Sequence, residues 1–318
     1  MDRTRGGDVP VREALEVLVE DPGFTELIDS RYGLERLGGG ATWSEGPLWL
    51  PGEDAVIWSD IPGNRILRWS AATGEVTVDR TDVEFTNGRT LDRQGRVVAC
   101  SHGRRAVERT EPDGTTTVLV HRFGSARFNS PNDVVVASDD AIWFTDPPYG
   151  IILPQEGHPG EREYGAHHVF RFVPGTGELT AVVVDVEEPN GLAFSPDERR
   201  LYVSDTSAAL RTDGGGQHCI RVYDVSSDWE CRGGRVFAEV EPGVADGFRV
   251  DEHGNVWTSS GDSVQVYAPD GTRLGKIPVP EKVGNVCFGG PGGDELFIAA
   301  STSLYRVRTR TRGASAAR

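Results

Sequence analysis

One pattern of strands and turns recurs along the chain, and this repeat constrains the fold more than any other sequence feature. Short runs of β-branched and aromatic residues, bounded by turn residues, are typical of strands. The most prominent runs cover residues 55–60, 96–100, 141–146, 200–205, 255–259 and 295–299. A first strand precedes each run, and a third strand follows it. A glycine-containing turn and a fourth strand complete most of these six equivalent units.

The sixth unit lacks a fourth strand, and residues 33–38 near the other end of the sequence are suited to supply it. This arrangement predicts an all-β fold, a six-bladed β-propeller of four-stranded blades whose last blade is closed by an N-terminal strand. We expect the propeller to cover residues 33–309 and a flexible tail to cover 310–318. Residues 1–32 are expected to form a short helical extension, because Asp8 and Pro10 suit a helix start and residues 14–18 carry an apolar stripe.

Composition and charge narrow the classes of partner. The chain has 33 Lys and Arg against 49 Asp and Glu, a formal net charge of −16. Nucleic acid and anionic membranes are therefore disfavoured as partners, because both require a basic face. No apolar run is long enough to span a bilayer, and residues 1–10 show no secretory signal, so a cytoplasmic location is expected. The cysteines lack C-x-x-C spacing and are expected to be reduced thiols; they are Cys100, Cys219, Cys231 and Cys287.

A polar residue occupies the same position in the first strand of every unit. The aligned residues are Glu45, Asn87, Asn132, Asn190, Asp246 and Asn285. First strands line the channel of a propeller, so these side chains should form a ring at one mouth. Carboxylates and carboxamides offer only oxygen ligands, which predicts a divalent cation, Ca²⁺ before Mg²⁺ or Mn²⁺. Any one Asn-Gly or Asp-Gly pair alone more often marks a turn.

Several motifs resemble those of the regucalcin (senescence marker protein)/gluconolactonase family, most closely its bacterial gluconolactonase-type members. They are SEGPLW (44–49), the block at 86–114, NSPNDVVVASDDAIWFTDPPYG (129–150), PNGLAFSPD (189–197) and DGFRVDEHGNVW (246–257). The resemblance implies a six-bladed propeller with one divalent cation at the channel mouth, Zn²⁺ being a further candidate ion. The family's metal ligands match Glu45, Asn132, Asn190 and Asp246. Asn87 and Asn285 then remain as supporting or substrate-facing residues.

The same resemblance implies metal-dependent hydrolysis of a sugar lactone, a gluconolactonase-like reaction of carbohydrate metabolism. The cation would polarise the lactone carbonyl, and a carboxylate would accept a proton from the attacking water. Asp246 is the first candidate for this general base. Asp133 is the second, because an aspartate beside a ligand often only orients that ligand. The absence of G-x-S-x-G disfavours a covalent acyl-enzyme.

Substrate contacts are expected from loops around the mouth, and the lactone is the expected small-molecule partner. The candidates are Arg127, Asn129, Asn87, His102 and Tyr149, although His102 is equally well an ordinary loop residue and Tyr149 more often packs. Residues 151–167, rich in Gly, Pro and Glu, are long enough to form a lid. Two alternatives remain open. One is another hydrolase on the same site, such as a phosphotriesterase or a different lactonase. The other is a non-enzymatic propeller that binds calcium or protein partners. The sequence leaves the oligomeric state open.

Overall fold

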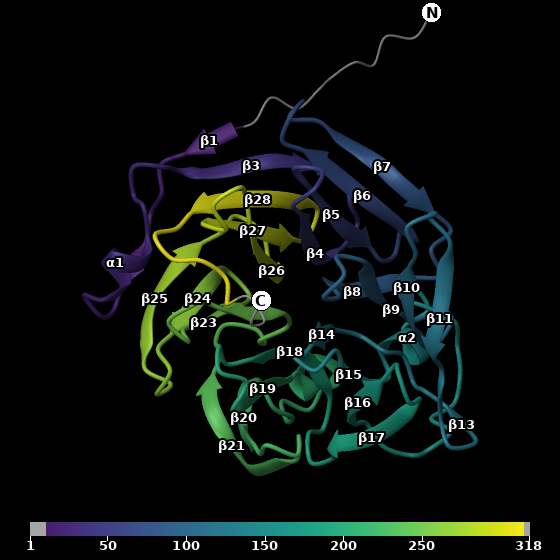
Figure 1. Cartoon of the computed structure of the whole chain (residues 1–318). Helices are drawn as coiled ribbons and strands as arrows, with labels where there is room; N and C mark the ends of the chain where they lie inside the picture. Colours follow the sequence, from purple (N-terminus) through teal and green to yellow (C-terminus); the bar gives the residue numbers. More distant parts are fainter. Residues whose placement is uncertain (1–10, 315–318) are drawn as a thin grey trace, which may run out of the picture.

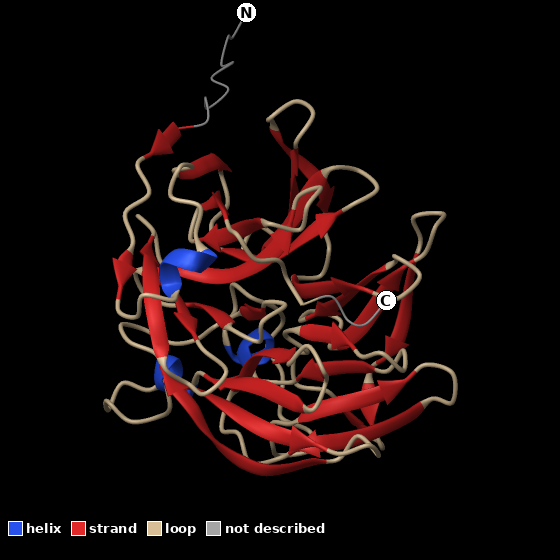
Figure 2. Ribbon diagram, turned by 60° about the vertical axis from the view of Figure 1, so that its left-hand side comes forward, coloured by secondary structure: helices blue, strands red, loops and turns tan. Residues whose placement is uncertain are grey.

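Sheets arranged in a ring about a central axis make up the protein (Figure 1). The computed structural model describes residues 11–314, which contain 28 strands and only short helices (Figure 2). The helices are α1 (Phe24–Leu27), α2 (Tyr149–Ile152) and the 3₁₀ helix η1 (Ser207–Leu210). No helix in the described range is both long and apolar enough to cross a membrane. The prediction of an all-β, six-bladed propeller is confirmed.

Each of the first three blades is an antiparallel sheet whose first strand lies nearest the channel. Blade 1 consists of β4 (Ser44–Leu50), β5 (Ala55–Asp60), β6 (Arg65–Ser70) and β7 (Val76–Thr81). Blade 2 consists of β8 (Thr86–Leu91), β9 (Val97–Ser101), β10 (Ala106–Thr110) and β11 (Thr116–Val120). Blade 3 consists of β14 (Val134–Val136), β15 (Ile142–Thr145), β16 (Val169–Val173) and β17 (Glu178–Val183). A small hairpin of β12 (Arg122–Phe123) and β13 (Ala126–Arg127) joins blades 2 and 3.

The remaining three blades repeat this order. Blade 4 consists of β18 (Pro189–Phe194), β19 (Arg200–Asp205), β20 (Cys219–Val225) and β21 (Cys231–Glu239). Blade 5 consists of β22 (Phe248–Val250), β23 (Val256–Ser259), β24 (Ser263–Tyr267) and β25 (Arg273–Pro278). Blade 6 consists of β26 (Val283–Gly289), β27 (Glu295–Ala300), β28 (Ser303–Arg308) and β3 (Leu34–Gly39).

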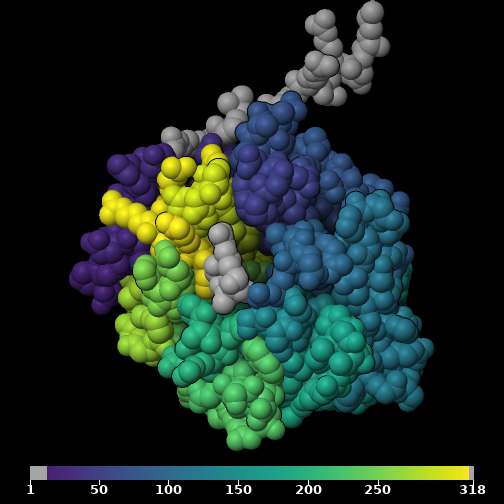
Figure 3. Space-filling view, in the orientation of Figure 1, coloured from purple at the N-terminus to yellow at the C-terminus, as the bar shows by residue number. Residues whose placement is uncertain are grey.

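The ring closes by pairing its two ends, as the incomplete sixth unit predicted. Strand β3 pairs antiparallel with β28, and Gly38 lies opposite Leu304 in the register. The space-filling view shows the N-terminal residues in purple against the C-terminal strands in yellow (Figure 3). Strands from both ends of the chain thus belong to one blade, and their pairing closes the ring.

The N-terminal segment differs from the prediction. The expected helix over residues 14–18 is wrong: β1 (Val11–Glu13) pairs with β3, and β2 (Leu18–Val19) pairs with β25. Unpaired outer edges of blades 5 and 6 offer backbone partners, and a short isolated helix is too weak to compete with them. Leu18 is 56% exposed, so its apolar side chain does not cover the core. Asp8 and Pro10 lie outside the described residues.

The short helix of this segment is α1, at Phe24–Leu27, and Phe24 is fully buried. Residues 310–314, which the sequence assigns to a tail, are bound to the propeller as far as they are described. Arg310 donates its backbone N–H to Leu27 at 2.8 Å, and Ala314 donates to Val250 at 2.8 Å. The last residues of the predicted tail, 315–318, lie outside the described range.

The core consists of apolar clusters, each pressed between two neighbouring blades. Five of the six interfaces contain such a cluster. Between blades 3 and 4, for example, Trp143 is fully buried, with ring centroids 5.1 Å from Phe194 and 6.1 Å from Trp229. Among the described residues the interface between blades 1 and 2 contains no such cluster.

Truncation of Trp143 tests this packing. Trp143→Ala is expected to lower the free energy of unfolding by about 3–5 kcal/mol, because it removes a large side chain from a close-packed interface. The indole N–H has no hydrogen-bond partner among the described residues. Trp143→Phe is therefore the matched control: it keeps most of the packing, removes an unpaired donor and should cost far less. Urea denaturation measures both, and equal losses would contradict the packing argument.

Candidate active site at one mouth of the central channel

The ring residues are fixed by backbone hydrogen bonds between neighbouring blades. Gly88 donates its N–H to the carbonyl of Asn132 at 2.8 Å, and Gly191 donates to the carbonyl of Asp246 at 3.0 Å. A Cβ atom on Gly191 would lie 2.4 Å from that oxygen of Asp246. The glycine after a ring residue is therefore required by the close approach of the next blade.

Hydroxyl groups at the ends of the second strands hold the same carbonyls. Thr145 Oγ1 donates to the carbonyl of Asn190 at 2.6 Å, and Ser204 Oγ donates to the carbonyl of Asp246 at 3.0 Å. Each hydroxyl belongs to the blade before the ring residue that it holds. The second strand of one blade thus sets the position of the ring residue in the next.

The aspartates at the ends of second strands are structural. Asp146 accepts the backbone N–H groups of Asn129 and Ser130, each at 2.8 Å. Asp60 and Asp205 accept equivalent pairs of N–H groups in blades 1 and 4. These carboxylates tie down the segment that leads into each inner strand, so they are occupied with the backbone and are not turned to the channel.

Glu45 is the most constrained carboxylate of the ring. It is 4% exposed, and its Oε2 accepts the Gly46 N–H at 2.9 Å and the Asn285 amide at 3.1 Å. Its Oε1 is buried and has no hydrogen-bond partner among the described residues. Burial, followed by the charge of Asp246, raises the pKa of Glu45 well above its ordinary value. An unpaired buried oxygen of this kind is costly unless a further group binds it.

Asp246 leads into blade 5, two blades from Glu45 on blade 1, and is half-buried. Burial raises the pKa of Asp246 to about 6, whereas the Lys282 charge and a hydrogen bond from Asn190 act to lower it. The charge of Asp246 raises the pKa of Glu45, because the two negative charges are close enough to repel. Sequence symmetry alone predicted this juxtaposition of residues on blades 1 and 5.

Asp133 lies deeper in the channel. Its Oδ1 accepts the N–H of Val134 at 2.9 Å, and its Oδ2 lies 3.3 Å from Nη1 of Arg249 on blade 5. The charge of Asp133 raises the pKa of both Glu45 and Asp246. Three carboxylates thus interact with one another here, and the cations that act on them are Arg249, Lys282 and Arg89.

His102 connects a ring residue to the long insert. It is fully buried; its Nδ1 donates to the carbonyl of Glu156 at 3.0 Å, and its Nε2 accepts the Asn87 amide at 3.3 Å. Burial lowers the pKa of His102 to about 4, so its imidazole group is neutral. The amide of Asn87 is therefore oriented with its nitrogen toward His102, and its buried Oδ1 has no partner among the described residues.

Two of the predicted substrate contacts face the insert and the blade framework. The Asn129 amide donates to the carbonyl of Asp146 at 3.0 Å and to the Tyr164 hydroxyl at 2.9 Å. The backbone N–H of Arg127 donates to Glu163 at 2.7 Å, on the peripheral β12–β13 hairpin (Figure 1). The structure brings neither side chain into contact with a ring residue.

Tyr149, the first residue of α2, lies nearer the ring. Its hydroxyl is hydrogen-bonded to Thr206 Oγ1. Burial is the main reason that the pKa of Tyr149 is raised, and the charges of Glu188 and Asp246 add to it. Tyr149 therefore lies close to Asp246, and its contact with substrate stays a prediction.

The insert at residues 151–167 adds a carboxylate that the sequence did not single out. Burial and the charge of Asp246 raise the pKa of Glu156 to about 7, and the charge of Lys282 acts to lower it. A Cβ on Gly157 would lie 2.2 Å from the carbonyl oxygen of Gly150, so the insert packs tightly here. Only the length of the insert hinted at this contact, because Glu156 and Lys282 lie outside the repeated positions.

Comparison with known proteins identifies the family. Residues 43–302 match the region described as SMP-30/Gluconolactonase/LRE-like. The chain belongs to this family. A gluconolactonase of Zymomonas mobilis is 31% identical over 315 residues, which cover 92% of this chain and 85% of that protein. A pentonolactonase of Haloferax volcanii is 30% identical over 269 residues, with 81% of each chain covered. The structure of a gluconolactonase from Xanthomonas campestris superposes with a TM-score of 0.87 at 38% identity, covering 97% of this chain and 100% of that one.

In this member of the SMP-30/gluconolactonase/LRE-like family, the ring chemistry fits a hard cation. No group of three His, Cys, Asp or Glu side chains within residues 11–314 is placed to hold an ion. A cation would therefore need amide oxygens beside the carboxylates. Unpartnered buried oxygens on Glu45 and Asn87 are consistent with such a mixed set of oxygen donors.

Proposed function

We propose that this protein hydrolyses a sugar lactone of the aldonolactone class at the ring, with one divalent cation, Ca²⁺ in the first instance. The observation that carries the proposal is the pairing of Asp246, whose pKa lies near 6, with the buried Glu45 at the channel mouth. Relatives named gluconolactonase and pentonolactonase support this choice of substrate class.

Four side chains would hold the cation: Glu45, Asn132, Asn190 and Asp246. When bound, a divalent ion polarises a carbonyl and stabilises the negative charge that water attack builds on its oxygen. Asn190 donates its amide nitrogen to Thr206 at 3.3 Å, which leaves its oxygen as the ligand atom. Asn285 supports Glu45 through the hydrogen bond at 3.1 Å and is not itself a ligand.

Asp246 is the general base in this proposal. With a pKa near 6 it is mostly ionised at neutral pH, and it accepts the proton of water as the oxygen bonds to the lactone carbonyl carbon. Protonated Asp246 then returns the proton to the endocyclic oxygen of the lactone as the bond between that oxygen and the carbonyl carbon breaks, giving a hydroxy acid. Asp133 is less suited to this step, because its carboxylate is buried and bound to Val134 and Arg249.

The substrate hydroxyls would form hydrogen bonds with the residues around the mouth. Asn87 presents an unpartnered oxygen, and His102 fixes the direction of that amide. The charge of Asp246 raises the pKa of Glu156, and the charge of Lys282 acts to lower the pKa of Asp246, so both residues border the same space. We propose that these four residues, with Tyr149, bind and orient the sugar part, and that Arg127 and Asn129 act by holding the insert.

A pH-stat assay of the purified protein tests the function. The protein is expected to release acid from D-glucono-1,5-lactone and from pentonolactones. The rate should fall at least tenfold in EDTA and return with added Ca²⁺, because the charge on the carbonyl oxygen would then be stabilised again. A phosphotriester serves as the comparison substrate. Full activity after metal removal would contradict the cation; turnover of the phosphotriester alone would contradict the substrate class.

A further inference from the structure

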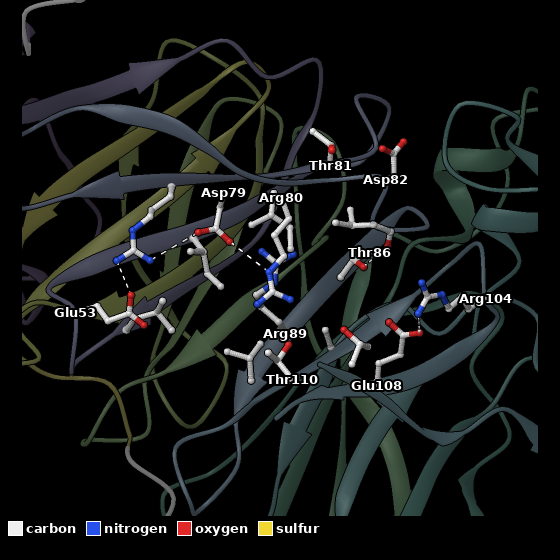
Figure 4. A pocket seen from close by; sticks show the side chains of 18 of the residues that line it. Glu53, Asp79, Arg80, Thr81, Asp82, Thr86, Arg89, Arg104, Glu108 and Thr110 are labelled. Carbon is white, nitrogen blue, oxygen red and sulfur yellow. Dashed lines mark hydrogen bonds and ion pairs between the residues drawn. The ribbon is translucent and has the colours of Figure 1, made fainter. Parts of the chain in front are cut away.

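The interface between blades 1 and 2 holds a cavity in place of an apolar cluster. The cavity has a volume of about 450 Å³, and strands β5–β7 of blade 1 and β8–β11 of blade 2 contribute its lining (Figure 4). Four arginines and four acidic residues line it: Arg68, Arg80, Arg89, Arg104, Glu53, Asp79, Asp82 and Glu108. Five interfaces exclude water with apolar side chains, so a polar sixth interface calls for an explanation.

Arg89 is the deepest cation of this cavity. Arg89 is 1% exposed. Its Nη1 donates to the carbonyl of Gly46 at 3.0 Å, and its Nη2 donates to Ser59 Oγ. Its Nε has no hydrogen-bond partner, and no carboxylate in residues 11–314 forms an ion pair with it. The charges of Asp79 and Glu45 act on Arg89 without forming a close ion pair with it, and a buried charge whose N–H donor is left unpaired is disfavoured.

The other charges of the cavity are at least partly compensated. Arg68 lies 2.6 Å from Glu53, and Arg104 lies 3.0 Å from Glu108. Arg80 is 3.7 Å from Asp79, a loose contact that leaves most of its donors available. Arg89 is then the arginine of the lining without an ion pair, and Asp82 is the acidic residue of the lining without one.

Arg80 lies beside Arg89. Figure 4 shows both guanidinium groups in the cavity. Burial is the main reason that the pKa of Arg89 is lowered to about 10; the charge of Asp79 opposes this shift, and the positive charge of Arg80 adds to it. Two like charges held together are unfavourable unless an anion lies between them. Planar guanidinium groups suit a carboxylate in particular, because two parallel N–H donors match its two oxygens.

The rest of the lining suits hydroxyl groups. Thr86, Thr110 and Thr116 face the cavity from blade 2, and carboxylates of Asp79 and Glu108 lie on opposite walls. Threonine hydroxyls donate and accept hydrogen bonds, and carboxylates accept them from alcohols. The volume lies within the range of small-molecule sites in proteins.

We propose that this cavity binds a small hydroxylated carboxylic acid, with its carboxylate on Arg89 and Arg80 and its hydroxyls on the threonine and acidic side chains. The occupant carries one carboxylate group, which the free N–H donors of Arg89 and Arg80 would bind. An aldonate has this chemistry and is also the product of the proposed lactone hydrolysis. Only the link to the product rests on the proposed function; the anion site rests on the cavity.

Calorimetric titration with gluconate tests the proposal, in EDTA and on the Asp246→Asn variant, so that the channel mouth does not contribute. One molecule of gluconate per chain is expected to bind. Arg80→Gln should weaken binding at least tenfold, because Arg80 is 41% exposed and its loss leaves the core intact. Arg235→Gln is the matched control: this arginine lies on β21, an outer strand of blade 4, beside Asp224, and its loss should change nothing.

Glucitol, which has the hydroxyls of gluconate but no carboxylate, should bind at least tenfold more weakly. Absence of gluconate binding, equal binding of glucitol, or full binding in Arg80→Gln would each overturn the site. Failure of the wild-type protein to hydrolyse any lactone, with gluconate binding still sensitive to Arg80→Gln, would overturn the proposed function and support the cavity site. The two proposals therefore fail separately.

Discussion

Replacing Asp246 with asparagine is expected to lower kcat/KM for an aldonolactone by about 10³-fold or more. General base catalysis alone contributes roughly 10²–10⁴-fold, and the substitution also removes one anionic oxygen from the ring. The fold should survive, because the backbone of Asp246 is held by Gly191 and Ser204, and these bonds do not involve the carboxylate.

Asp270→Asn is the matched control on the same blade. Asp270 is exposed and accepts the N–H of Thr272 in a surface turn, so its substitution should leave the kinetics unchanged. Circular dichroism and thermal denaturation would establish that both variants fold. Retention of more than a tenth of wild-type kcat/KM in Asp246→Asn would remove Asp246 as the base.

The fold follows from sequence because the signals repeat. Six similar units average out the ambiguity of any one strand, and the missing sixth outer strand points to β3 as its replacement. Symmetry also predicts which residues meet, since equivalent positions of inner strands must face one axis. Glu45 and Asp246, 201 positions apart in the chain, come within electrostatic range for this reason alone.

Features that do not repeat escape this reasoning. Glu156 reaches the mouth because the insert packs on Gly150 and His102, and no periodic signal encodes that path. The N-terminal segment forms edge strands because blades 5 and 6 offer free backbone groups, which only the assembled ring creates. The unpaired Arg89 is equally invisible, because its lack of a partner is a property of the packed interface.

In the metal-free protein the buried carboxyl of Glu45 lowers the free energy of unfolding at neutral pH, and a neutral residue at this position would remove that loss. Burial and the charge of Asp246 raise the pKa of Glu45, so the folded state holds its proton more tightly than the unfolded chain. Stability is then lost as pH rises from the unfolded pKa, about 4.3, through the raised folded pKa. A bound divalent cation would reverse this balance by stabilising the ionised form.

Glu45→Gln is therefore expected to have opposite effects on stability with and without metal. In EDTA at neutral pH the variant should unfold at a higher temperature than the wild type, since glutamine is neutral and its amide oxygen still accepts from Gly46 and Asn285. With Ca²⁺ at about 1,000 times its dissociation constant, the wild type should gain about 4 kcal/mol and the variant almost nothing.

Differential scanning calorimetry with and without Ca²⁺ measures this reversal in the order of stability of the wild type and Glu45→Gln. Glu75→Gln, in an exposed turn of blade 1, should follow the wild type in both conditions. A variant that is less stable than the wild type in EDTA would show that the Glu45 charge is already balanced by the protein. A variant that keeps the full Ca²⁺-dependent rise would move the cation away from the ring. The reversal is expected only if Glu45, the buried carboxylate that destabilises the metal-free fold, also binds the ion.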